Sequence, residues 1–238
     1  MGMGRFVFAL LAVALLVIAA GCENPDTNVK TEKTLTINEV TVHYSGDVSL
    51  SQAKALIDFV GETFQITGET NVYLSKSGDA YTVEVTTPYT SPDQIDDATR
   101  FYVEMMASKM SQDVFGGAKS TLKLVTDEGS ELFSAESRYS YVNSGTIYVW
   151  YAGIGEDKAK AVLDYAVSLV GEGPWDIILE GSNPYNVKTV SSFESREEIG
   201  DAENTYRQMA SDLSQKLGGN VVIHVLNPEG KEIAAFSS

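Results

Sequence analysis

Apolar and polar residues alternate in one short stretch near the start of each half of the chain. Val40-x-Val42-x-Tyr44 is the first alternating stretch, and Ile147-x-Val149-x-Tyr151 is the second. A period of two is typical of a β-strand that buries one face. Apolar residues at helical spacing follow each stretch and predict an amphipathic helix with a buried stripe. The stripes are Ala53, Leu56, Ile57, Val60 and Phe64 in the first half, and Ala159, Val162, Leu163, Ala166 and Val170 in the second.

Cap and turn residues divide the rest of each half into a hairpin, a second helix and a final hairpin. Ser49-x-x-Gln52 is a capping box for the first helix of the first half. The second helix is predicted to begin at Ser91-Pro92-Asp93-Gln94 and at Ser195-Arg196-Glu197-Glu198, because acids favour a helix N-terminus and proline suits its first position. Turn residues predict hairpins around 76–79 and 127–129 in the first half, and around 181–184 and 227–230 in the second.

The two halves share residues in the same order, which predicts a tandem duplication. The segment AKALIDF at 53–59 recurs as AKAVLDY at 159–165, and ASKMSQ at 107–112 recurs as ASDLSQ at 210–215. Ordered matches at one long period are typical of a duplicated unit, and this period is too long for a solenoid. We therefore expect repeat domains at 35–136 and 146–238, joined by a linker at 137–145.

The predicted order of elements in each repeat is β-α-β-β-α-β-β. Its first six elements have the split βαβ pattern of ferredoxin-like folds, in which two helices cover one face of an antiparallel sheet. The prediction is therefore an α+β protein made of two tandem ferredoxin-like repeats. In that strand order the first strand lies between the third and the fourth, which would place Trp150 between Lys188 and His224.

The second helices of the two repeats do not align perfectly. The later one keeps an apolar stripe from Ile199 to Leu217, but the earlier one matches it only if a residue is inserted near Met105. Without that insertion Lys109 would fall on the buried face. The sequence therefore predicts a π-type bulge or a local overwinding at this place.

The N-terminal segment, residues 1–21, is expected to be an export signal. Arg5 is its only charged residue, and the apolar run Phe6–Ala20 is shorter than the roughly 20 residues that span a bilayer. The segment ends in Ala19-Ala20-Gly21-Cys22, which resembles the lipobox of bacterial lipoproteins. That resemblance implies cleavage before Cys22 and attachment of a diacylglycerol to its sulfur. A plain signal peptide with an incidental cysteine, or an uncleaved anchor, are the alternatives.

Charge and cysteine content restrict the partners. The chain has 33 acidic and 17 basic residues, a formal net charge of −16, and one cysteine. This charge argues against binding to nucleic acid, and a lone cysteine excludes an intrachain disulfide and a multi-thiolate metal site. Anionic headgroups repel such a body, so lipid on Cys22 would hold it at the cell membrane, on the outer face or in the periplasm. Residues 22–34 would form the lipidated, flexible tether.

The sequence favours no catalytic site, metal or cofactor. The two histidines, His43 and His224, fall in different repeats, and no Gly-x-Ser-x-Gly elbow is present. Asp93, Asp96 and Asp97 lack the spacing of an EF-hand loop, and helix capping explains them. A hydrolase that works through two carboxylates between the repeats is the alternative, because an acidic chain readily brings such a pair together.

The sheet face that the helices leave uncovered is the candidate binding surface. In the first repeat its residues are an ordinary solvated set that includes Thr41, His43, Glu84 and Lys123. In the second repeat they are more apolar and aromatic, which is unusual for a surface left in water. Either an envelope protein, a peptide or a small ligand binds this face, or the first repeat or the linker covers it; a plain structural spacer is the remaining alternative. The candidate binding residues are Tyr148, Trp150, Lys188, Val190, His224 and Leu226.

Overall fold

The computed structural model describes residues 32–64, 68–170 and 173–238. The predicted export signal, Cys22 and almost all of the predicted tether lie outside the described residues. The elements of the first half are β1 (Lys33–Ile37), β2 (Val40–Tyr44), α1 (Leu50–Thr63), β3 (Thr70–Ser77), β4 (Ala80–Thr86), the 3₁₀ helix η1 (Pro92–Gln94), α2 (Asp97–Asp113), β5 (Ser120–Val125) and β6 (Glu131–Glu136). Those of the second half are β7 (Ser140–Ser144), β8 (Ile147–Ala152), α3 (Glu156–Val170), β9 (Trp175–Glu180), β10 (Tyr185–Val190), α4 (Arg196–Ile199), α5 (Ala202–Leu217), β11 (Val221–Leu226) and β12 (Glu232–Ser237).

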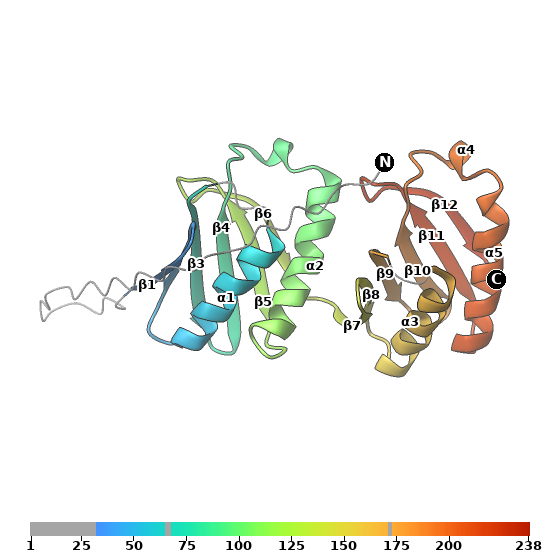
Figure 1. Ribbon diagram of the computed structural model, residues 1–238, viewed down its shortest axis with the longest axis horizontal. Coiled ribbons are helices and arrows are strands. Elements are labelled where there is room, and N and C mark those ends of the chain that lie inside the picture. The colour runs from blue at the N-terminus through green and yellow to red at the C-terminus, as the bar shows by residue number, and fades with distance from the viewer. Residues whose placement is uncertain (1–31, 65–67, 171–172) are drawn as a thin grey trace, which may run out of the picture.

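Each half forms one six-stranded mixed sheet whose strands lie in chain order, β1 to β6 in the first and β7 to β12 in the second. Hairpins join β1 to β2, β3 to β4 and β5 to β6 as antiparallel pairs. Helix crossovers make β2–β3 and β4–β5 parallel, and the second half repeats this scheme with β8–β9 and β10–β11. Figure 1 shows the long helices α1 and α2, and α3 and α5, on one face of their sheets.

The prediction of ferredoxin-like repeats is wrong. A ferredoxin-like sheet is antiparallel and inserts another strand between those that each helix connects, whereas here each helix joins two neighbouring parallel strands. A pattern of apolar residues shows that a strand, a helix and a strand follow one another, but it does not specify how far the second strand lies from the first. One consequence is that Trp150 lies between Tyr141 and Ile178, while Lys188 is paired with His224.

Two edge strands were not predicted. β1 begins within the expected tether, and β7 occupies most of the expected linker. Both are short and have no buried residue: β1 has only the two alternating apolar residues Leu35 and Ile37, and β7 has Tyr141 and Val142 next to each other, which is too little to identify a strand. They pair with β2 and β8 and complete the two sheets.

The helix starts agree with the predicted capping in part. The box of Ser49 and Gln52 is confirmed at the start of α1. The second helix of each half, however, begins later than predicted, after a separate short turn. Asp96 caps α2 through a 2.7 Å hydrogen bond to the Thr99 N–H, and Gly200, with φ of 47°, separates α4 from α5.

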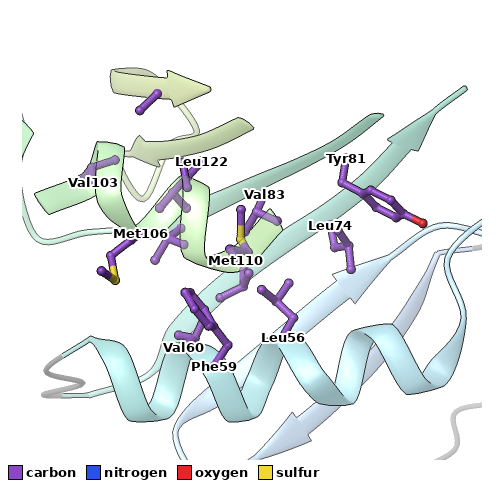
Figure 2. Packing of buried hydrophobic residues seen from close by; sticks show 14 of the residues in the cluster. Leu56, Phe59, Val60, Leu74, Tyr81, Val83, Val103, Met106, Met110 and Leu122 are labelled. Atoms are coloured by element: carbon purple, nitrogen blue, oxygen red, sulfur yellow. The ribbon is translucent and has the colours of Figure 1, made fainter. Parts of the chain in front are cut away.

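Apolar side chains fill the space between helices and sheet in each half. Figure 2 shows Met110 of α2 among Val83 and Leu122 of the first sheet and Leu56 and Val60 of α1. All five are at most 1% exposed. Burial of one such side chain contributes roughly 1.5–3 kcal/mol, so this layer holds the first half together.

The predicted bulge in the second helix is absent, because α2 is α-helical from Asp97 to Asp113. The stripe is irregular for another reason: α2 is packed on two sides. Met106 and Met110 lie in the core of the first half, while Ser108 and Lys109 contact the second half. Lys109 therefore does lie on a packed side of the helix, facing the other sheet.

Candidate binding surface

Trp150, the main predicted anchor, is buried between the two halves. It is 1% exposed and belongs to the apolar core that also holds α1 and α2. Its indole Nε1 donates a 2.8 Å hydrogen bond to Asp176, and its ring centroid lies 5.2 Å from that of Tyr141 and 5.6 Å from that of Tyr148. Trp150 is therefore an internal anchor in this structure and is not available to another molecule.

Helix α2 is the cover of this face. The hydroxyl of Ser108 accepts hydrogen bonds of 3.1 Å from the backbone N–H groups of both Arg138 and Tyr139. The Lys109 ammonium lies 5.0 Å from the centroid of the Tyr141 ring and 5.5 Å from that of Tyr148. The sequence leaves two interpretations open for this part of the face, a binding surface or cover from within the chain, and the structure shows cover by α2 of the first half.

Lys109 is charged in spite of its partial burial. Burial works to lower the pKa of its ammonium, but Asp113, 2.5 Å away, and the two tyrosines outweigh that effect and raise the pKa above its ordinary value. Asp113 also accepts a 2.6 Å hydrogen bond from the hydroxyl of Tyr141. The ion pair lies within α2, and the contacts of both its members with Tyr141 join α2 to β7.

A second polar group, Glu180 of β9, lies at the border of the covered face. Its carboxylate accepts hydrogen bonds from Lys188 at 2.7 Å, from the Tyr139 hydroxyl at 2.7 Å and from Arg138 at 2.8 Å. Burial favours a raised pKa for Glu180, but its donors outweigh burial and lower the pKa. For Tyr139, burial and the bond to Glu180 raise the pKa of the phenol.

Asp176 has the opposite electrostatics. The surrounding protein removes water from its carboxyl and raises its pKa, although the hydrogen bond from Trp150 offsets part of the effect. The charge of Asp176 in turn helps burial to raise the pKa of Tyr102 on α2. The contact between the halves therefore contains two carboxyl groups with opposite shifts: the surroundings lower the pKa of Glu180 and raise the pKa of Asp176.

The remaining predicted residues are divided between the core and the outer part of the face. Leu226 is buried, whereas Tyr148, Lys188, Val190 and His224 are partly exposed. The ring nitrogens of His224 lie 2.8 Å from Glu232 and 3.0 Å from Asn186, and Lys188 is paired with Glu180. A binding role for this outer part stays a prediction.

The corresponding face of the first sheet is open. Within the described ranges, α1 and α2 pack on its other face and no helix lies on this one (Figure 1). Tyr73, 40% exposed, stacks on His43 with ring centroids 4.7 Å apart, and Asn71 lies 3.1 Å from the His43 ring. The strand register places one polar residue of each strand in a row: Thr34, His43, Tyr73, Glu84, Lys123 and Ser134.

From the sequence alone, this row is expected to be ordinary solvated surface, and the face of the second half is the preferred binding surface. The sequence signal that could have identified this row as the open face is the difference in polarity between the corresponding faces of the two halves. The apolar face needed a cover from within the chain, and only the polar face could stay in water without one. Within the described residues, the first sheet therefore offers the face on which no helix packs.

An open hollow of about 430 Å³ lies on the outer side of the α3–α5 pair. Asp212, Gln215 and Lys216 of α5 and Tyr165 and Ser168 of α3 line it. The Tyr165 hydroxyl donates a 3.0 Å hydrogen bond to Asp212, and burial together with this bond raises the pKa of Tyr165 to about 12. No group of three histidine, cysteine, aspartate or glutamate side chains in the described chain is placed to hold a metal ion.

None of the helices in 32–64, 68–170 and 173–238 is long and apolar enough to cross a membrane.

The AF_1994_N family model, which describes the N-terminal domain of its family, matches residues 34–137, the span from β1 to the end of β6. An uncharacterized protein of Archaeoglobus fulgidus is 34% identical over 230 residues, which is 95% of this chain and 94% of that one. A solved structure of a Clostridium difficile protein assigned to phenazine biosynthesis (PhzC/PhzF) aligns with 81% of this chain and 82% of its own at 12% identity, but its TM-score of 0.18 does not support a shared fold.

Proposed function

This chain belongs to the same family as the Archaeoglobus fulgidus protein, and we propose that it is a lipid-anchored, extracytoplasmic binding module. The proposal has two parts, an anchor at Cys22 and a binding surface on the open face of the first sheet. The observation that carries it is the difference between the two sheets. The same face is covered by α2 in the second sheet and left accessible in the first.

The N-terminal sequence supports the anchor. Removal of residues 1–21 takes away one base, Arg5, and no acid, so the mature chain has 33 acids against 16 bases, a net charge of −17. Two or three acyl chains give stable attachment where a charged body alone is repelled by anionic lipid. The 11 residues 22–32 before β1 could extend by at most about 40 Å, which keeps the first sheet close to the membrane.

The arrangement of the sheets supports a duplicated origin. Strand order, pairing directions and the position of the crossover helices are the same in both halves. In the present chain one copy of the face is apolar and covered by α2, and the other copy is polar and has no described helix packed on it. Tyr73, His43 and Asn71 then supply a ring and polar groups that an envelope protein, a peptide or a small ligand could contact.

The anchor is tested by mass spectrometry of the full chain purified from membranes of an export-competent host. We expect the N-terminal peptide to begin at Cys22 and to carry the mass of a lipid. The Cys22→Ser variant should be unlipidated and leave the membrane fraction. An unmodified Cys22 in membrane-bound protein would overturn this part of the proposal.

The surface is tested with a photo-crosslinking amino acid in place of Tyr73 or Thr82 in the anchored protein. The matched control carries the same group in place of Leu50, which is 60% exposed on the helix side of the sheet. We expect the same adduct from both positions on the face and none from position 50. Adducts that are no more frequent on the face than at the control would remove the face as a binding surface.

A further inference from the structure

We infer that copies of this chain associate head to tail, with the outer side of α5 of one copy on the open face of the first sheet of the next. The inference rests on the proposed function, because it names the partner of that open face as a second copy. It follows from a contact that the chain already makes within itself. The outer side of α2 packs on the equivalent face of the second sheet.

The receiving surface recurs in the first sheet. In the second sheet the register places Tyr148 beside Asp176 and Trp150 beside Ile178. In the first sheet it places Thr41 beside Asn71 and His43 beside Tyr73, on the matching strands β2 and β3. The chain therefore has two copies of this surface, of which one is already covered by α2.

The inserting surface recurs in α5. The repeated segments ASKMSQ and ASDLSQ place Ser211, Asp212 and Gln215 of α5 where α2 has Ser108, Lys109 and Gln112. Asp212 and Gln215 line the open hollow of about 430 Å³ between α3 and α5. The helix side that packs on a sheet in the first half is thus accessible in the second half.

The chemistry of the two free surfaces differs from that of the internal contact. His43 and Tyr73 replace the buried Trp150 and Ile178, and on the helix the pair Asp212 and Lys216 reverses the charge order of Lys109 and Asp113. Polar outer faces are typical of terminal repeats, which must remain soluble. The contact between chains is therefore polar, weaker than the internal one and sensitive to salt.

Membrane attachment makes such a weak contact effective. Tethering raises the local concentration of the partner surfaces, as a linker does between two binding modules. A helix side that meets a different surface on the next copy is a heterologous contact, and it extends into a row unless the rotation closes a ring. Lipid-anchored copies would accordingly line up along the membrane.

The test uses cysteines at positions that match a close contact within the chain. Tyr139, whose N–H lies 3.1 Å from the Ser108 hydroxyl, corresponds by strand register to Glu32, and Ser108 corresponds to Ser211. A serine Oγ at this distance from a backbone nitrogen keeps the two Cα atoms within about 7 Å, close to the upper limit of the separation that a disulfide spans. The lipidated protein carries either Glu32→Cys or Ser211→Cys, each with its own affinity tag, and Cys22 has no free thiol once it is lipidated.

The two variants are mixed in vesicles at low ionic strength and oxidised mildly. We expect a mixed disulfide dimer in at least fivefold excess over a control mixture of Ser211→Cys with Glu128→Cys, which lies in the β5–β6 turn. The double variant Glu32→Cys/Ser211→Cys should give a ladder of oligomers. A yield equal to the control, or a preference for Glu32→Cys homodimers, would overturn the inference.

The crosslinking experiment at position 73 distinguishes failure of this inference from failure of the proposed function. If position 73 still forms a specific adduct with another molecule while the disulfide yield equals the control, the open face binds something other than a second copy. If the adduct is missing as well, the binding surface itself is wrong.

Discussion

Trp150 of β8 donates its indole N–H to the carboxylate of Asp176 on the neighbouring strand β9, 2.8 Å away, within the contact between the two halves. The pair joins the most buried aromatic ring of that contact to a carboxyl whose pKa is raised by burial. Packing of Trp150 therefore stabilises the fold, whereas burial of the Asp176 charge opposes it. Substitutions at the two residues measure the two contributions separately.

Replacement of Trp150 by alanine is expected to lower the free energy of unfolding by about 3–5 kcal/mol, because it opens a cavity in the contact. Denaturant titration followed by circular dichroism measures the loss. Leu50→Ala, at a position that is 60% exposed, is the control and should stay within about 0.5 kcal/mol of the wild type. A loss at Trp150 as small as at Leu50 would mean that the halves do not pack as described.

Asp176→Asn is expected to change how stability depends on pH. The carboxyl has a higher pKa in the folded chain than in the unfolded one, so its contribution to stability is present at low pH and is lost as pH rises from about 4 through the raised pKa. Asparagine keeps an acceptor for Trp150 but carries no charge. The variant should therefore gain stability relative to the wild type between pH 4 and pH 7, as measured by urea titrations.

Glu180→Gln should show the opposite sign. Its pKa is lowered in the folded chain, so the ionised form contributes stability above the ordinary glutamate pKa of about 4.3, and this contribution is lost as pH falls through the lowered pKa. We expect the variant to be less stable than the wild type by about 1–2 kcal/mol at pH 7, with a smaller difference in acid. Asp127→Asn, in the β5–β6 turn, serves as the control for both carboxyl variants.

Lys109 and Tyr148 should be energetically coupled. A double-mutant cycle with Lys109→Ala and Tyr148→Leu isolates the contact of the ammonium with the ring from the packing that each side chain makes elsewhere. The expected coupling is about 0.5–1 kcal/mol, in the range of a partly desolvated cation–π pair. Coupling near zero would show that Asp113 and Tyr141, and not Tyr148, hold the lysine.

Much of the local structure could be predicted from particular residues. The alternation around Val42 and Val149, the helix stripe that contains Leu56, and the capping box at Ser49 are all in place. Each depends on neighbours within a few residues, so the physical cause is present in the local sequence.

The order of the strands could not be predicted in the same way, because it depends on which surfaces meet in space. β7 carries too few large apolar residues to be recognised, yet its Tyr141 lies opposite Trp150 and helps to bury it. The burial of Trp150 itself depends on α2, whose second packed side looked like an irregular stripe around Met105. Of the candidate residues of the second sheet, Trp150 and Leu226 are buried and the other four are partly exposed, while the face on which no described helix packs belongs to the first sheet.

Every strand in the two sheets pairs with strands that are its neighbours in sequence. Such pairing closes short loops and gives a low contact order, which favours rapid folding. Domains generally fold from the N-terminus during synthesis. Helix α2 precedes β8 in the chain and can therefore form first, so the aromatic residues of the second sheet find their cover already folded, which shortens the time in which they could aggregate.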